Sequence, residues 1–201
     1  MMRRYILIGI VGVLGVVILL VGWQVFSKPY TYQGSLIEPP IKAPEIALID
    51  QDGKPFRLSD HLGKVVLVFY GYTNCPDVCP LTLSDFKLIK AELGEQADQV
   101  TFVFITVDPE RDTQDRLKAY LSNFDSTFTG LTGNIEALEN VWKAYGVYKA
   151  KQETGSAAGY LVDHTARTYA IDKEGNLRLT YPFEMERQAL LDDVRQLIKE
   201  Q

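Results

Sequence analysis

The stretch Val65-Val66-Leu67-Val68-Phe69-Tyr70-Gly71-Tyr72-Thr73-Asn74-Cys75-Pro76-Asp77-Val78-Cys79-Pro80 contains both cysteines of the chain. Its first six residues form a continuous apolar run, which predicts a strand buried on both faces of a sheet. The pattern that follows predicts a helix from Leu81 to Leu93, with Pro80 in its first turn. A strand, a loop and a helix in this order bring backbone N–H groups and the positive helix end toward the sulfurs. Thiolates are stabilised there, so we expect both cysteines to be reactive or metal-binding.

A structural disulfide is the plainer explanation of the cysteine pair. Cys75 and Cys79 stand at positions i and i+4, which puts their Cα atoms about 6 Å apart around a helix start, within disulfide range. A bond that closes so short a loop removes little unfolded-state entropy, and a chain of 201 residues can build a core without it. The sequence therefore favours a functional pair.

The N-terminus is apolar enough to cross a membrane. Between Tyr5 and Phe26 the only polar side chain is Gln24, and this length suffices for a bilayer core of about 30 Å. Arg3 and Arg4 precede the run, which predicts a cytoplasmic N-terminus and an extracytoplasmic C-terminal part. A cleaved signal peptide has a shorter apolar region that ends at small residues. We therefore expect a single-pass anchor, and the absence of an Arg/Ser-rich leader favours a bacterial plasma membrane.

Composition divides the chain into three parts. Residues 1–27 are the cytoplasmic N-terminus and the anchor, the Pro-containing residues 28–42 read as an extended tether, and residues 43–201 are sufficient for one domain. The formal net charge is −5, and the first 28 residues carry only basic charges, so the remainder is more acidic still. This charge excludes a nucleic-acid partner.

The order of the predicted elements indicates an α/β fold. Strands alternate with helices and are closed by a hairpin and a last helix, as in a thioredoxin-like sandwich, in which a central sheet is flanked by helices. The expected elements are an N-terminal hairpin over 46–58, a strand over 100–107, helices over 114–124 and 135–145, a hairpin of strands 160–172 and 177–181, and a helix over 184–198.

One histidine separates this site from that of an ordinary oxidoreductase. Thiol–disulfide oxidoreductases of the thioredoxin fold have two residues between their cysteines and a cis-proline opposite them. Here three residues intervene, and His164 stands at the expected proline position. Two thiolates and an imidazole suit Cu(I), whereas structural zinc takes four protein ligands. Cys75, Cys79 and His164 are therefore the predicted ligands of one copper ion.

Three other residues near these motifs are assigned differently. Asp77 and Asp163 could accept a hydrogen bond from the imidazole or complete an oxidised Cu(II) site, but ordinary surface carboxylates explain them equally well. His61 lies in a polar turn, so we expect it to be exposed to solvent and to have no part in the site.

Three segments together give a family resemblance. Gly71 to Pro80, Asp163-His164 and the segment Val107-Asp108-Pro109-Glu110-Arg111-Asp112-Thr113 resemble the Sco (SenC) family of cytochrome oxidase assembly proteins. The resemblance runs from about Tyr32 to the last helix. It implies a membrane-anchored, thioredoxin-like protein that binds copper through two cysteines and one histidine and helps to build the dinuclear copper (CuA) centre of cytochrome c oxidase subunit II. Physically, the third segment reads as a strand end followed by a helix cap at Asp112 or Thr113.

Three functions remain open from the sequence. The first is a copper metallochaperone whose partners are cytochrome c oxidase subunit II and an upstream copper donor or thiol reductant. The second is a thiol–disulfide reductase that keeps the CuA cysteines reduced. The third is a redox or copper sensor. Only the second would make the chain an enzyme, and His164 favours the first because a reductant needs no imidazole ligand.

Overall fold

The computed structural model describes residues 12, 14, 15, 17, 29–156 and 159–200. The chain divides into two units, Met1–Thr31 and Tyr32–Gln201, and the second contains every element described below. The predicted anchor in residues 1–27 lies outside the described residues except at four positions. No helix within the described part of the chain combines the length and apolarity needed to cross a membrane.

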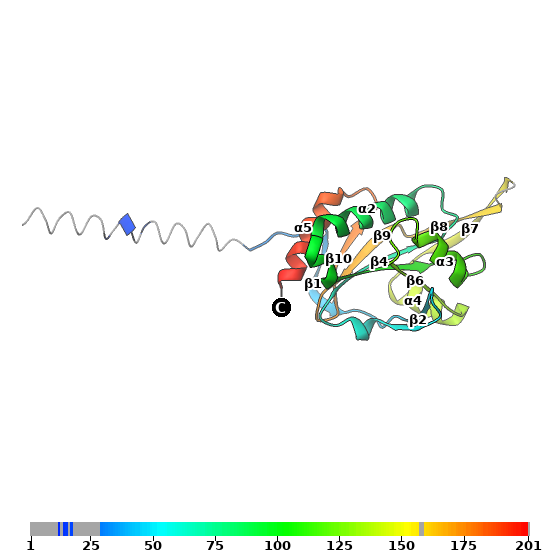
Figure 1. Ribbon diagram of the computed structural model, residues 1–201, viewed down its shortest axis with the longest axis horizontal. Helices are drawn as coiled ribbons and strands as arrows, with labels where there is room; N and C mark the ends of the chain where they lie inside the picture. The colour runs from blue at the N-terminus through cyan, green and yellow to red at the C-terminus, as the bar shows by residue number, and fades with distance from the viewer. Residues whose placement is uncertain (1–11, 13, 16, 18–28, 157–158, 201) are drawn as a thin grey trace, which may run out of the picture. The chain divides into compact units, whose positions relative to one another are not determined.

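Strands and helices alternate from Val65 to Ala144, and runs of strands precede and follow this part (Figure 1). Their order is β1 (Ser35–Lys42), β2 (Ala47–Asp50), β3 (Pro55–Arg57), η1 (Leu58–His61), β4 (Val65–Gly71), α2 (Val78–Leu93), η2 (Gly94–Gln99), β5 (Val100–Thr106), α3 (Gln114–Leu121), β6 (Thr129–Thr132), α4 (Ile135–Ala144), β7 (Lys149–Ser156), β8 (Gly159–His164), β9 (Arg167–Ile171), β10 (Asn176–Pro182) and α5 (Arg187–Lys199).

Eight of the strands form one mixed sheet in the order β1-β10-β9-β4-β5-β6-β2-β3. The central strand β4 runs parallel to β5 and antiparallel to β9, and all seven of its residues are buried. Helices α2 and α5 lie side by side over one face of the sheet (Figure 1). The predicted α/β thioredoxin-like class and the hairpin of β2 and β3 are confirmed.

Aromatic packing fixes α2 on the sheet. Phe86 of α2 lies 5.4 Å from the ring of Phe102 on β5 and 6.3 Å from that of Phe128, measured between centroids. All three rings are buried. This contact holds the helix whose first turn carries Cys79.

The predicted helix ends are corrected by one to three residues. Helix α2 begins at Val78 rather than Leu81, because Pro80 occupies the first turn, where a missing N–H breaks no intrahelical hydrogen bond. Cys79 is therefore helical and not part of the loop. The last helix begins at Arg187 rather than Glu184, after a turn in which Met185 N–H donates to the Pro182 carbonyl. Helices α3 and α4 end slightly earlier than predicted.

The prediction of a tether without regular structure over residues 28–42 is wrong from Ser35 onward. Residues Ser35–Lys42 form strand β1, which pairs antiparallel with β10 at one edge of the sheet. An edge strand tolerates proline because one side of it donates no ladder hydrogen bonds. The register is interrupted between Leu36 and Ile41, the interval that contains Pro39 and Pro40. The domain therefore begins near Tyr32 and not at residue 43.

The predicted strand 160–172 is two strands that pair with different partners. Strand β9 pairs with β10 as expected, but β8 pairs with β7, which the sequence analysis missed. The residues of β7 are mainly polar and lack apolar alternation, so no period signal marks them. We call the hairpin Lys149–His164 the β7–β8 arm, which extends beyond the main sheet and is yellow in Figure 1. His164 is the last residue of its second strand.

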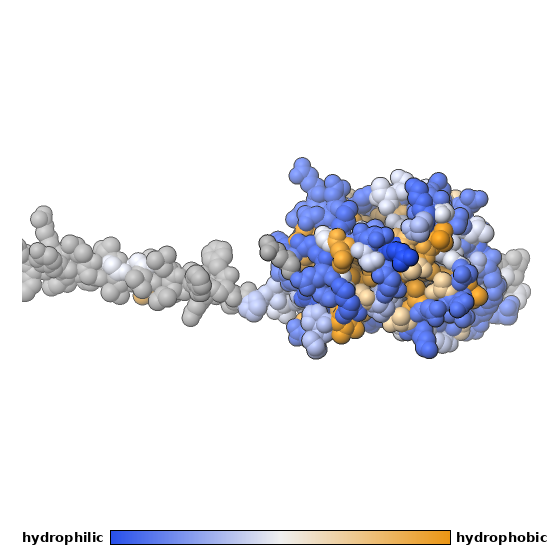
Figure 2. Space-filling view, turned by 90° about the horizontal axis from the view of Figure 1, so that it is seen from below, coloured by the Kyte–Doolittle hydropathy of each residue, from blue (hydrophilic) through white to orange (hydrophobic). Residues whose placement is uncertain are grey.

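The surface in Figure 2 is mainly hydrophilic, with apolar residues in separate patches. Most large apolar side chains lie in one buried cluster around β4, β5 and α2. On the face shown, no patch dominates the described surface.

Candidate metal centre

Three side chains from distant parts of the chain converge at the end of β4. Cys75 lies in the loop after β4, Cys79 in the first turn of α2, and His164 at the end of β8. Their ligand atoms all lie within 4.8 Å of one another. Cys79 Sγ is 3.6 Å from His164 Nε2, and neither cysteine forms a disulfide. The structure thus brings together the three residues that the sequence singled out as ligands.

The two sulfurs differ in their environment. The Cys79 thiol donates a hydrogen bond to Cys75, and further hydrogen bonds from His164 and from the main chain of Asp77 and Cys79 help to lower the pKa of Cys75 to about 4. The main-chain N–H of Cys79 lies 3.4 Å from Cys75 Sγ. Cys79 is buried, and desolvation raises the pKa of its thiol. The metal-free site therefore holds one thiolate, on the more exposed cysteine.

Gly71 makes room for the buried sulfur. A Cβ atom at this position would lie 2.7 Å from Cys79 Sγ and 2.8 Å from the ring of Phe104. Either distance is shorter than a van der Waals contact. The close approach of α2 to the end of β4 therefore requires glycine at this position.

His164 is oriented with Nε2 toward the sulfurs. Its ring meets Phe69 and Tyr72 edge to face, at centroid distances of 6.1 and 5.8 Å. Its Nδ1 lies 3.3 Å from the Thr165 carbonyl, which can only accept, so Nδ1 carries the proton. A metal at the sulfurs would take the place of a proton on Nε2 and bind its lone pair, the form in which histidine binds metals.

Asp112 holds the cysteine loop in place, a role that the sequence analysis missed. Its buried carboxylate accepts hydrogen bonds from the N–H and hydroxyl of Thr73, two residues before Cys75, and from the Thr106 hydroxyl at the end of β5. Burial raises the pKa of this carboxyl. The helix cap is Thr113, whose hydroxyl accepts from Arg116 N–H. The spacing of the residues in Val107–Thr113 could not have shown which residue, Asp112 or Thr113, faces the cysteine loop.

The remaining candidate residues do not join the site. Asp77 is exposed and its side chain does not cap α2, although its main chain contacts Cys75. Asp163 is exposed and accepts from Gln152 Nε2 at 2.8 Å. Neither carboxylate belongs to the group of converging ligand atoms among the described residues. The prediction that His61 is solvent-exposed is wrong, because its ring is partly buried and stacks on Phe56 at 4.6 Å.

The sequence of the chain is similar to those of proteins in one known family. The family model described as SCO1/SenC matches residues 36–199. The chain belongs to the SCO1/SenC family. An SCO2-like protein of Rickettsia prowazekii (strain Madrid E) is 36% identical over 168 residues, which are 83% of this chain and 82% of the relative. The family resemblance predicted from the sequence is confirmed.

Two solved structures of the SCO1/SenC family are similar to this domain. Bradyrhizobium japonicum ScoI, solved with copper bound, matches with a TM-score of 0.71 and 36% identity over 78% of this chain and 99% of that chain. The solution structure of apo Sco1 from Thermus thermophilus matches with a TM-score of 0.74 and 36% identity over 84% of this chain and 98% of that chain. The family therefore includes a protein of this fold that holds copper.

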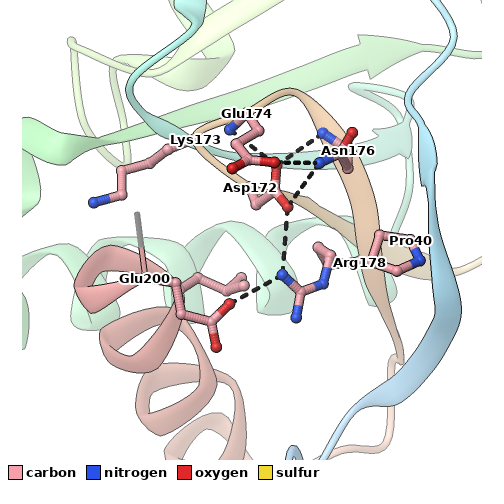
Figure 3. Close-up of a pocket in the computed structure, with 8 residues that line it drawn as sticks. Pro40, Asp172, Lys173, Glu174, Asn176, Arg178 and Glu200 are labelled. Atoms are coloured by element: carbon pink, nitrogen blue, oxygen red, sulfur yellow. Dashed lines mark hydrogen bonds and ion pairs between the residues drawn. The ribbon is translucent and has the colours of Figure 1, made fainter.

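A polar pocket of this SCO1/SenC domain shares no lining residue with the group of converging side chains. It has a volume of about 100 Å³ and lies between β10 and α5 (Figure 3). Arg178 Nη1 lies 3.4 Å from the Asp172 carboxylate and 3.0 Å from that of Glu200. Asp172 also accepts from the main chain of the β9–β10 turn, at Glu174 and Asn176. The charges of this pocket are thus used in holding α5 and the turn together.

Proposed function

We propose that this chain is a membrane-anchored copper metallochaperone that carries one copper ion and supplies it to the CuA centre of cytochrome c oxidase subunit II. The observation that carries the proposal is the convergence of Cys75 Sγ, Cys79 Sγ and His164 Nε2 within 4.8 Å. Two soft sulfur ligands and one imidazole select Cu(I), which accepts three-coordinate geometry. The family membership and the copper-bound relative support the same cargo.

The unequal burial of the two sulfurs suits a carrier. Cys75 is partly exposed, whereas Cys79 is buried beneath the helix start. An incoming thiolate of the acceptor can therefore reach the metal on the Cys75 side and replace that ligand first. The ion moves by ligand exchange and keeps its oxidation state, so delivery of Cu(I) needs no oxidant or reductant.

A thiol–disulfide reductase is the second candidate, favoured by the lowered pKa of Cys75. A thiolate next to a protonated thiol can attack a disulfide of the acceptor and then be released by the second sulfur. Two electrons and the proton of Cys79 pass to the acceptor, a second proton comes from water, and Cys75 and Cys79 become a disulfide. That reaction makes no use of a histidine nitrogen directed at the sulfurs.

The substitution His164→Ala separates the two functions. If the chain delivers copper, the variant loses copper affinity and the cells lose CuA assembly in copper-poor medium, while the cysteine pair still oxidises and reduces. His61→Ala is the matched control, because the chain has only these two histidines and His61 lies outside the site. Normal oxidase levels in the His164→Ala strain would overturn the chaperone function and support the reductase.

The location completes the proposal. The apolar run from Tyr5 to Phe26 would anchor the chain in a bacterial plasma membrane, with the metal centre on the extracytoplasmic side. A fusion of a periplasm-active reporter to the C-terminus tests this orientation. An inactive reporter on a fusion that accumulates to normal levels would contradict it.

A further inference from the structure

The β7–β8 arm carries His164, so the contacts that fix the arm against the domain also fix the third proposed ligand. Tyr160, Val162 and His164 share one face of β8, because successive side chains of a strand point to opposite sides. Val162 is buried and its main chain hydrogen-bonds to the Tyr72 hydroxyl. Asp163, on the other face, is exposed. The face with His164 is therefore turned toward the domain.

Asp108 and Arg111 hold Tyr160 at the far end of this face. The Tyr160 hydroxyl donates to the Asp108 carboxylate at 2.7 Å. Arg111 Nη1 donates to the Tyr160 carbonyl at 2.9 Å, and the guanidinium carbon lies 3.7 Å from the centroid of the Tyr160 ring. Arg111 Nε also pairs with Asp108. We call these three residues the Tyr160 clasp.

The clasp is shielded from water, unlike the other charged contact of the arm. The side chain of Asp108 is 1% exposed and that of Arg111 is 20% exposed. By contrast, Lys151 and Glu110, which also join the arm to the domain, are 45% and 66% exposed. Charge-assisted hydrogen bonds are stronger when desolvated, whereas exposed ion pairs contribute little. The clasp is therefore the stronger of the two attachments.

The clasp and the support of the cysteine loop come from one short segment. Asp108 and Arg111 contact the arm, whereas Asp112 holds Thr73 in the cysteine loop. In addition, Val107 N–H donates to the carbonyl of Gly71 at the end of β4. Residues 107–112 thus contact both segments that carry the converging side chains.

We propose that the Tyr160 clasp is a positioning device that sets the distance of His164 Nε2 from the two sulfurs and so tunes the metal affinity of the site. Tyr160 and His164 are four positions apart on an extended strand, about 13 Å, and both lie on the inner face. Release of Tyr160 frees the outer end of β8, and the imidazole then loses its fixed approach to Cys79. The cysteine pair stays in place, because Asp112 and α2 hold it independently. This inference rests on the copper function proposed above.

Two substitutions loosen the clasp with little change in shape. Tyr160→Phe keeps the ring and removes the hydroxyl that reaches Asp108. Arg111→Lys keeps the charge but removes the planar fork that spans Asp108 and the Tyr160 carbonyl. Glu110→Gln is the control, because it removes the charge of the exposed pair with Lys151, while the amide oxygen can still accept the long 3.5 Å contact from the Tyr160 hydroxyl.

The first readout is metal-free and concerns the imidazole itself. The full chain, kept in detergent because of its apolar N-terminus and labelled with ¹⁵N only at histidine, gives ring signals from His61 and His164 alone. In the wild type the rings of Phe69 and Tyr72 shift the His164 signals. Both clasp variants should move these signals toward those of an unstructured histidine. The His61 signals, and all signals of Glu110→Gln, should stay unchanged.

The second readout is Cu(I) affinity measured by competition with a chelator. Changes to residues that orient a metal ligand typically cost about 10–100-fold in metal affinity, so Tyr160→Phe and Arg111→Lys should approach His164→Ala. The control should stay within about fivefold of the wild type. Adding Tyr160→Phe to His164→Ala should cause no further loss, because the clasp acts through that histidine.

Two results would overturn the inference. One is a wild-type His164 spectrum and copper affinity in Tyr160→Phe. The other is an additive loss of affinity in the double variant, which would show that the clasp acts through the fold in general. If His164→Ala leaves copper affinity unchanged, the proposed function fails, but the metal-free spectra still decide whether the clasp positions His164.

Discussion

At the scale of single residues, the two cysteines of the site have the same side chain but different surroundings. Cys75 lies in the loop and is partly exposed, and the Cys79 thiol and main-chain groups donate hydrogen bonds to it. Cys79 is buried next to Gly71. Sequence spacing shows that the two sulfurs can meet, whereas burial decides which one is the thiolate. Reactivity measurements can test this division.

The metal-free, reduced chain should react with iodoacetamide at Cys75 first and with little dependence on pH. The pKa of Cys75 is about 4, so its thiolate remains dominant as the pH falls from 8 to 6, and the rate should change by less than about twofold. An ordinary cysteine slows by roughly 75-fold over this interval. Mass spectrometry of timed samples identifies the modified residue. Cys75→Ser is the control, since buried Cys79 should react slowly; preferential labelling of Cys79 in the wild type would contradict the assignment.

Gly71→Ala should disturb the site by pushing the sulfur of Cys79 aside. The added methyl group would lie 2.7 Å from Cys79 Sγ, and overpacking of this kind costs about 1–3 kcal/mol of stability. Copper affinity should fall as well, because one ligand is displaced. Gly133→Ala is the matched control, since its Cβ would lie 3.2 Å from the end of the Leu48 side chain, away from the metal centre. Denaturation and copper competition assays measure both effects, and equal copper affinity in the two variants would refute the explanation.

At the scale of secondary-structure elements, β1 shows how a segment without a strong pattern becomes part of the sheet. Just before β1, the N–H groups of Gln33 and Gly34 donate to the buried carboxylate of Asp193 on α5, which also contacts the Tyr181 hydroxyl. The strand itself pairs with β10. The segment thus ties the edge of the sheet to the last helix.

Removal of residues 1–42 should destabilise the domain more than removal of residues 1–28. The longer deletion eliminates β1 and takes two donors from the buried carboxylate of Asp193, and loss of partners for a buried charged group costs about 1–3 kcal/mol or more. We therefore expect the free energy of unfolding in urea to fall by about 2–4 kcal/mol relative to the shorter deletion. Equal unfolding midpoints and slopes for the two chains would show that β1 adds no stability.

At the scale of the whole molecule, the metal centre joins parts of the chain that fold into different layers. The cysteines belong to the junction of β4 and α2, whereas His164 comes from the arm, 85 residues after Cys79. A metal bound by all three would therefore crosslink the sheet, a helix and the arm. Any ligand that binds only the folded state stabilises it by mass action.

Cu(I) should raise the stability of the chain, and chelation should reverse the effect. With free copper at about 100 times its dissociation constant, the gain is about 2.7 kcal/mol, less whatever copper binds to the thiols of the unfolded chain. Thermal unfolding under reducing conditions, with and without a Cu(I) chelator, measures the shift. The double variant Cys75→Ser and Cys79→Ser should show none. A copper-dependent shift of the same size in this variant would place the metal elsewhere.

The sequence was sufficient for the local features of this protein. The apolar run Val65–Tyr70 predicted the central strand, because only a strand covered on both faces is apolar throughout. The Cys-Pro spacing and the position of His164 predicted the three converging side chains, since these motifs lie at fixed points of the fold. The partly buried His61, by contrast, was misassigned because its stacking partner Phe56 is visible only in three dimensions.

The tertiary structure alone decided how the ligand-bearing segments are held. β7 is polar, β1 contains two prolines, and neither has a periodic pattern, so their pairing depends on which edges the rest of the fold leaves available. Likewise, Asp108, Arg111 and Asp112 read in sequence as a strand end and a helix cap. Their contacts to Tyr160 and Thr73 span 39 to 52 residues, and local propensity carries no information over such separations. The residues that could bind the metal were therefore readable from the chain, whereas the residues that position them were not.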